Sequence, residues 1–284
     1  MQSVLQPDIP HEILSSGVDW ITATAQKGST RWDMQVYADN ERRRLMDSGE
    51  SITNGYRQGY YGWQCEGFFH GNREGGSMVI ASGAVAHNVF RSVANVADHI
   101  SRLDVQTTVT FPQDRPHLGV QAYSALKSGT PSKVKVKNVT LITSHPQGET
   151  VNIGKRSSDL YARLYDKATE AGMGEARSVW RYEVELKRRQ AGTCAARLLA
   201  DRPAEMVALS IVHDHFSARG VVPVFTPDPT FCPQKPMLTS EPRNILTWFE
   251  QSLSISVARA IHRHGLVRVL ESLGLASQVE VKRQ

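Results

Sequence analysis

Two stretches in which polar residues alternate regularly constrain this chain most. The first runs from Gly154 to Lys167 and the second from Trp180 to Lys187. If both are strands, every second side chain lies on the same face. The shared face then carries Tyr161, Arg163, Tyr165 and Lys167 from the first stretch, and Arg181, Glu183, Glu185 and Lys187 from the second. Tyrosines, carboxylates and cations together favour a polar, phosphate-bearing ligand and suggest phosphoryl transfer on nucleic acid.

Composition narrows the class of protein. The net charge of +5 over 284 residues favours a polyanionic partner. No stretch approaches about 18 uninterrupted apolar residues, so we expect no membrane span. The first ten residues lack the order of a secretion signal. Cys65, Cys194 and Cys232 form no CxxC pair, which favours reduced thiols over disulfides or structural zinc. We therefore expect a cytoplasmic protein with no membrane partner.

The order of predicted elements indicates an α+β fold. Residues 17–24, 77–82, 100–109 and 134–143 have strand patterns, and 55–76 suggests twisted strands or a hairpin. Helices are predicted over 31–49, 89–100, 116–129 and 192–217, and a turn at 148–149. Because the order lacks regular βαβ alternation, we expect a mixed, mainly antiparallel curved sheet with helices packed on one side.

Three segments are predicted along the chain. Residues 1–221, which hold both polar stretches, form one catalytic domain that acts on nucleic acid. A proline-rich linker covers 222–243, and residues 244–284, with helical apolar spacing, form a small C-terminal unit.

A tyrosine that attacks a DNA phosphodiester needs a nucleophilic hydroxyl, groups that stabilise charge on the phosphoryl oxygens, and assistance for the leaving oxygen. A divalent ion held by carboxylates can polarise the phosphate. The alternating stretch at 100–109 adds a carboxylate. The candidates are Tyr165 as nucleophile, Asp104, Glu183 and Glu185 as metal ligands, and Arg163, Lys167 and Arg181 as phosphate contacts.

Each candidate also has a structural interpretation. Tyr165 has the character of a half-buried sheet tyrosine, since aromatic residues favour strands. Glu183 and Glu185 suit a solvated face paired with neighbouring cations, and Asp104 suits an ordinary cross-strand pair with Arg102. Lysines at 133, 135 and 137 suit a solvent-facing edge that deters aggregation. The residues alone leave these alternatives open.

The motifs together resemble the trans-acting rolling-circle replication initiators of small plasmids and filamentous phages, the replication initiation factor family. Ser101-Arg102-Leu103-Asp104 resembles the family's T/S-R-L/I-D strand. Gly154-Lys155-Arg156-Ser157-Ser158, followed by Arg163-Leu164-Tyr165-Asp166-Lys167 and Glu170, resembles its G-x-R-x-S…R-I/L-Y-x-K-x-x-E core. Trp180-Arg181-Tyr182-Glu183-Val184-Glu185-Leu186-Lys187 resembles its W-R-x-E-x-E-L-K strand. Val18-Asp19-Trp20 and Leu273-Gly274-Leu275 are similar to phage-type members.

The resemblance implies an enzyme that nicks and rejoins one strand at a replication origin through a 5′-phosphotyrosyl link. It implies Tyr165 as nucleophile, with Arg163 and Lys167 beside it and Tyr161 as second choice. It implies Mg²⁺ or Mn²⁺ on Asp104, Glu183 and Glu185. The expected DNA contacts are Arg156, Ser158, Arg181, Lys187 and Arg188. The expected partners are double-stranded and single-stranded origin DNA, a host helicase and a second copy of the chain.

One position departs from the family's pattern. Many plasmid members carry an acidic residue four positions after the aspartate of the R-L-D strand, where this chain has Thr108. Two other functions stay open. A conjugative relaxase of the same family would nick a transfer origin, although only about seventeen residues precede the first predicted strand, which favours replication. A non-catalytic DNA-binding regulator would retain the tyrosine without using it.

Overall fold

The structure is a computed structural model that describes residues 10–26, 28–111, 117–128, 136, 138–144, 148–172, 178–200 and 203–228. All of these lie in the first of the two units into which the chain divides, Met1–Leu238. The predicted C-terminal unit at 244–284, most of the linker, and positions 133, 135 and 137 lie outside the described residues. The described helices include none long and apolar enough to cross a membrane.

Ten strands form one sheet. They are β1 Glu12–Ala25, β2 Thr53–Arg57, β3 Tyr60–Cys65, β4 Phe68–Arg73, β5 Gly76–Ser82, β6 His99–Phe111, β7 Val139–Ser144, β8 Gly148–Ile153, β9 Leu160–Asp166 and β10 Ser178–Lys187. Their order across the sheet is β2-β3-β4-β5-β1-β6-β10-β9-β8-β7. Every pairing between neighbours is antiparallel, which confirms the predicted α+β class.

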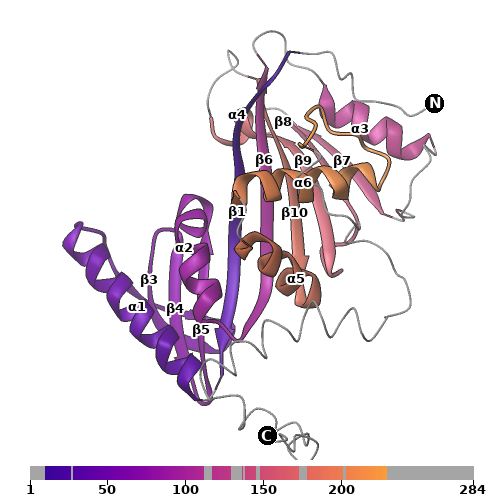
Figure 1. Cartoon of the computed structure of the whole chain (residues 1–284). Coiled ribbons are helices and arrows are strands. Elements are labelled where there is room, and N and C mark those ends of the chain that lie inside the picture. The colour runs from indigo at the N-terminus through magenta and orange to yellow at the C-terminus, as the bar shows by residue number, and fades with distance from the viewer. Residues whose placement is uncertain are drawn as a thin grey trace, which may run out of the picture. The chain divides into compact units, whose positions relative to one another are not determined.

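The helices are α1 Ser29–Asp47, α2 Gly83–Val96, α3 Leu118–Lys127, α4 Lys167–Glu170, α5 Arg188–Leu199 and α6 Ala204–Ser217. Helices α2, α5 and α6 pack against β1 and β6 on one face of the sheet (Figure 1). The sequence places apolar residues at every second position of the central strands, and these side chains form the interface with the helices. The prediction that helices pack on one side of the sheet is therefore confirmed.

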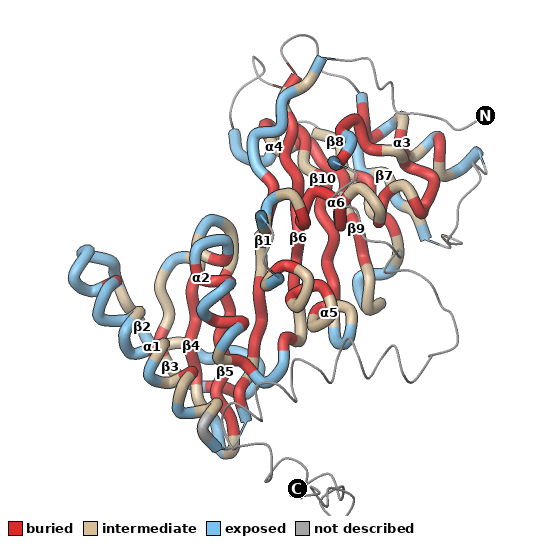
Figure 2. Tube along the Cα trace, in the orientation of Figure 1, coloured by how far each residue is buried: buried red, intermediate tan, exposed pale blue. Residues whose placement is uncertain are grey.

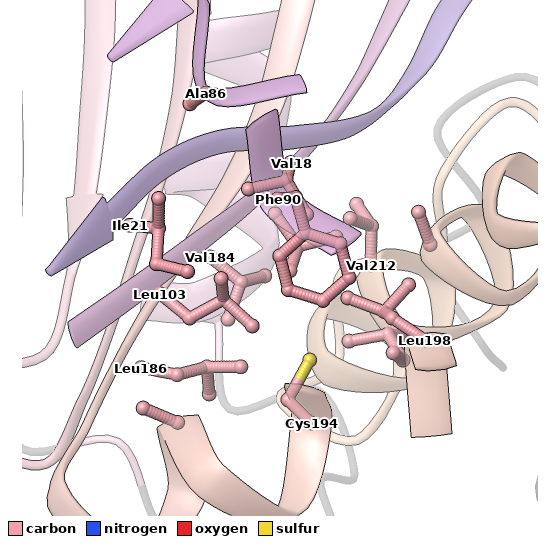
Figure 3. Packing of buried hydrophobic residues seen from close by; sticks show 14 of the residues in the cluster. Val18, Ile21, Ala86, Phe90, Leu103, Val184, Leu186, Cys194, Leu198 and Val212 are labelled. Carbon is pink, nitrogen blue, oxygen red and sulfur yellow. The ribbon is translucent and has the colours of Figure 1, made fainter. Parts of the chain in front are cut away.

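The central core lies between this face and the helices. Leu103 of β6 and Val184 of β10 pack with Cys194 of α5, Val212 of α6 and Phe90 of α2 (Figure 3). Strands β6 and β10 are buried along almost their whole length (Figure 2). The polar residues that alternate with them therefore lie on the opposite face of the sheet, and many of these are buried too.

A β-bulge interrupts strand β1 where it crosses this core. Val18 is paired with Val105 of β6, and Trp20 is paired with Asp104, which leaves Asp19 as an extra residue. Val18 and Ile21 are three positions apart, yet both are in the core cluster (Figure 3). In a regular strand they would point to opposite faces. The bulge thus restores the apolar register and adds a residue on the polar side.

Several predicted boundaries differ from those observed. The helix predicted at 89–100 is α2, which begins at Gly83 and ends at Val96, because His99 and Ile100 already pair in β6. The helix predicted at 192–217 is two helices, α5 and α6, separated before Pro203, where a proline disfavours helical backbone in the preceding residue. The turn predicted at 148–149 is the start of β8, which pairs with β7 and β9.

The start of the predicted linker is packed. Phe225 is buried and its ring lies edge-on to Tyr182 of β10, with 5.2 Å between ring centroids. Val224 is also part of the core cluster. Residues 222–228 have little regular structure, as their prolines suggest, but they cover the helix-side core.

Candidate active site

The polar residues of the two alternating stretches line one face of neighbouring strands, in rows fixed by strand register. Tyr165 of β9 lies opposite Arg181 of β10, which lies opposite Thr108 of β6. In the next row, Arg163 faces Glu183, and Glu183 faces Gln106. In the row beyond, Tyr161 faces Glu185, and Glu185 faces Asp104. The sequence prediction of a shared face is therefore confirmed.

Tyr165 has a carboxylate and an arginine close to its side chain. Its hydroxyl donates a hydrogen bond to Glu183 Oε2 at 3.1 Å, and Arg163 Nη2 donates to the other oxygen of the same carboxylate. The Arg163 guanidinium carbon lies 5.5 Å from the centroid of the Tyr165 ring. Burial and the charge of Glu183 raise the pKa of the Tyr165 hydroxyl, which stays protonated at neutral pH. Glu183 is placed to accept that proton.

Tyr161 is bonded differently. Its hydroxyl donates to Asn152 Oδ1 of β8 at 2.5 Å, an amide oxygen that cannot serve as a base at neutral pH. Burial raises the pKa of Tyr161 as well, and Arg163 opposes that shift. Both tyrosines lie on the predicted face, but only Tyr165 donates to a carboxylate among the described residues.

The predicted metal ligands are held by cations of the protein. Arg102 makes two hydrogen bonds to Asp104, at 2.9 and 2.5 Å, and its Nη2 lies 3.1 Å from Glu185 Oε2. Lys187 Nζ lies 2.6 Å from Glu185 Oε1. Burial raises the pKa of Asp104 to about 7, which outweighs the attraction of Arg102. These carboxylates are therefore neutralised within the protein itself.

This arrangement does not fit a divalent ion held by all three carboxylates. Within the described part of the chain, no three histidine, cysteine or acidic side chains lie close enough together to hold a metal. Asp104 and Glu185 are cross-strand neighbours, whereas Glu183 belongs to the next row and pairs with Arg163. The Mg²⁺ or Mn²⁺ site of Asp104, Glu183 and Glu185 stays a prediction, and no chemical step is assigned to it.

Lys167 departs from the predicted alternation. Strand β9 ends at Asp166, whose side chain accepts a hydrogen bond from the Thr169 amide at 3.0 Å and caps α4. Lys167 is thus the first residue of a short helix rather than a strand residue. Its Nζ still lies 5.9 Å from the centroid of the Tyr165 ring and pairs with Glu170 at 2.5 Å. Lys167 is therefore placed near Tyr165 by the start of α4 and not by strand alternation.

The predicted DNA contacts divide between the two ends of the β9–β10 pair. Arg181 is beside Tyr165, whereas Lys187 is at the far end, where its Nζ donates to the carbonyl oxygen of Arg156. Ser158 Oγ lies 2.6 Å from the carbonyl oxygens of Lys155 and Leu160, so this hydroxyl stabilises the turn between β8 and β9. Arg188, at the start of α5, is exposed and pairs with Asp159 at 2.7 Å.

Two residues of this face were not among the predicted site residues. Arg102 bridges Asp104 and Glu185, and its guanidinium carbon lies 4.6 Å from the centroid of the Trp20 ring. Asp19, the bulge residue of β1, accepts a hydrogen bond from Arg181 Nη1 at 3.0 Å. Arg102 and Asp104 are two positions apart, so the sequence already predicted that they share a face. The contact of Asp19 with Arg181 was not predicted, because it joins β1 to β10 across β6, and no pattern in the sequence gives that strand order.

Residues 123–220 match the model of the family described as "Replication initiation factor". The family resemblance is confirmed over this segment. The matched segment contains Tyr165, Glu183 and Glu185, whereas Asp104 lies outside it.

A solved structure titled as a rolling circle replication initiator protein from Geobacillus stearothermophilus is similar in fold. The TM-score is 0.51 with 17% sequence identity, over 83% of this chain and 95% of that chain. At this identity the likeness concerns the fold. No curated protein matches the chain by sequence.

Proposed function

We propose that this protein is a rolling-circle replication initiator that nicks and rejoins one DNA strand at an origin, with Tyr165 as nucleophile. The observation that carries the proposal is the hydrogen bond from the Tyr165 hydroxyl to Glu183, on a face that also holds Arg163 and Arg181. The family match and the similar fold of an initiator support the same biological role.

The proposed step uses only groups present on this face. The Tyr165 oxygen bonds to phosphorus, and the bond from phosphorus to the 3′ oxygen of the neighbouring nucleotide breaks. The tyrosine proton passes to Glu183, and the released 3′ oxygen takes up a proton from water. Arg163 and Arg181 lie beside the tyrosine, where guanidinium groups stabilise charge on phosphoryl oxygens. Attack of a 3′ hydroxyl on the phosphotyrosine reverses these bond changes and rejoins the strand.

The test is formation of a covalent protein–DNA adduct. Labelled single-stranded oligonucleotides tiled across both strands of the DNA flanking the gene are incubated with protein, with Mg²⁺, Mn²⁺ or EDTA, and resolved on a denaturing gel. We expect an adduct from the wild type and none from Tyr165→Phe, since only the nucleophilic oxygen is removed. Tyr61→Phe, on the exposed side of β3, is the matched control and should behave as the wild type.

Each other outcome contradicts a named part of the proposal. An adduct lost in Tyr161→Phe and kept in Tyr165→Phe moves the nucleophile to Tyr161. Wild-type protein that binds a tiled oligonucleotide without forming an adduct in any metal condition favours the DNA-binding regulator. An adduct formed fully in EDTA contradicts the predicted requirement for Mg²⁺ or Mn²⁺.

A further inference from the structure

Asp19, the extra residue of the β1 bulge, contacts Arg181, the cation beside Tyr165. Arg181 lies opposite Tyr165 in the β9–β10 register, and two different strands hold its guanidinium group. Nη1 donates to Asp19 Oδ1 of β1 at 3.0 Å, and Nε donates to Thr108 Oγ1 of β6 at 3.0 Å. A long, rotamer-rich side chain is thereby fixed at two points.

The support of Arg181 extends further along β6. Thr108 Oγ1 donates to Gln106 Oε1 at 2.7 Å, and Gln106 Nε2 donates to Ser15 Oγ of β1 at 3.1 Å. Because the Thr108 hydroxyl hydrogen is used in the bond to Gln106, the oxygen is oriented to accept from Arg181. Gln106 and Thr108 are both buried, so this chain of bonds is shielded from competing water.

The bulge leaves Asp19 on the polar side of β1 and brings Trp20 to that side as well. Without the extra residue, the alternation set by Val18 would place residue 19 on the polar side and residue 20 on the core side. With it, Trp20 pairs with Asp104 and stacks on Arg102, while Asp19 reaches Arg181. One insertion thus places two neighbouring side chains on the polar side of β1, and each of them contacts a different arginine.

We infer that Asp19 is a positioning residue of the nicking reaction: it acts through Arg181, and together with Thr108 it fixes that guanidinium group beside Tyr165 to contact the reacting phosphate. Nε and Nη1 of Arg181 are occupied by protein acceptors. Nη2 has no acceptor among the described residues and is the nitrogen left for a phosphoryl oxygen. The inference rests on the proposed nicking function.

Asp19 is expected to affect the rate of reaction more than DNA affinity. It carries a negative charge and does not favour DNA binding by itself, whereas a guanidinium held in one geometry contributes to transition-state stabilisation. Removing Asp19 leaves the charge of Arg181 in place and releases its orientation. Removing Arg181 takes away both.

The experiment is a double-mutant cycle on adduct formation with the full-length protein and an oligonucleotide that the wild type cleaves. Single-turnover rates at saturating DNA are measured for Asp19→Ala, Arg181→Ala and the double variant. We expect Arg181→Ala to lose about a hundredfold and Asp19→Ala up to about a hundredfold. The double variant should be no slower than Arg181→Ala alone, because Asp19 acts only through that arginine. The dissociation constant should change less than twofold in Asp19→Ala.

Two further variants keep the test decisive if Asp19→Ala fails to fold. Thr108→Ser retains the hydroxyl that accepts from Arg181, whereas Thr108→Val removes it at nearly the same volume. We expect wild-type rates from the serine variant and a loss from the valine variant. Glu41→Ala removes an acid paired with an arginine on α1, at 2.6 Å, and is the matched control.

Several outcomes would overturn the inference. A wild-type rate in Asp19→Ala would show that the contact is dispensable, and multiplied losses in the double variant would show that Asp19 acts independently of Arg181. Equal rates for Thr108→Ser and Thr108→Val would show that the Thr108 hydroxyl does not help to position Arg181. Wild-type protein that forms no adduct, with binding confirmed, refutes the proposed function itself, and this outcome is distinct from the others.

Discussion

Removal of Glu183 should destabilise the protein as well as abolish nicking. The Glu183 side chain is only 2% exposed, and it accepts from both Arg163 and Tyr165. Truncation to alanine leaves the guanidinium group of Arg163 without its carboxylate. Arg163 Nε is already buried and has no hydrogen-bond partner among the described residues. Breaking a buried ion pair by removing one partner costs about 3–5 kcal/mol.

The lower end of this range applies because the Arg163 side chain remains 29% exposed and water can reach it. We therefore expect Glu183→Ala to lose about 3 kcal/mol of unfolding free energy. In a protein of this size, that corresponds to a fall of about 6–12 °C in Tm. The assay is thermal unfolding at pH 7, followed by circular dichroism.

A compensating double variant separates stability from chemistry. Replacing both partners by apolar residues, as in Arg163→Met with Glu183→Leu, removes the unpaired charge and should recover most of the lost stability. It should still form no adduct, since the proposed proton acceptor is gone. Glu170→Ala is the matched control, because Glu170 is 52% exposed in its pair with Lys167. Such a surface pair contributes at most about 1 kcal/mol.

Two results would refute this reasoning. A Tm within about 2 °C of the wild type for Glu183→Ala, equivalent to less than about 1 kcal/mol, would mean that water solvates Arg163 well enough to replace the carboxylate. A double variant less stable than Glu183→Ala would mean that the polar face cannot accept apolar side chains.

Three further predictions concern positions outside the candidate active site. Burial lowers the pKa of His70 to about 4, so between pH 6.5 and pH 4 the unfolded chain binds a proton that the folded protein does not. The contribution of His70 to the free energy of unfolding is complete above pH 6.5 and is lost as the pH falls, by up to about 3 kcal/mol. In His70→Gln, the free energy of unfolding should therefore depend less steeply on pH over this range. An unchanged slope would contradict this. A Cβ at Gly62 would lie 2.0 Å from the carbonyl oxygen of His70, so Gly62→Ala should disrupt the β3–β4 pairing and lower Tm. A Cβ at Gly192, inside α5, would meet none of the described residues outside its own helical turn within 4 Å, and Gly192→Ala should instead stabilise by about 0.5–1 kcal/mol. A Tm change of the same sign in both variants would show that steric space does not decide the outcome.

The amino-acid sequence by itself determined which residues share the polar face. Alternation with period two fixes the side of Tyr165, Arg163 and Glu183 as soon as both stretches are strands, and the apolar residues between them fix the side of the helices. The fold class, predicted from the order of elements, is confirmed. The family resemblance, which three motifs carry, is confirmed over residues 123–220.

Tertiary structure decided which of these residues meet across the sheet and which cation pairs with each carboxylate. The metal site of three carboxylates stays a prediction. Strand register places Asp104 opposite Glu185 and one row away from Glu183, and each carboxylate has an intramolecular cation. Lys167 reaches Tyr165 through a helix cap rather than along the strand.

The partner of Arg181 was also beyond local patterns. Asp19 lies 162 positions away in the chain and reaches the arginine from β1, on the other side of β6 from β10. Cross-strand contacts depend on register, and register depends on packing along the whole sheet. A bulge gains its stability from restoring the apolar register of Val18 and Ile21, so its position follows from the core rather than from the residues it displays.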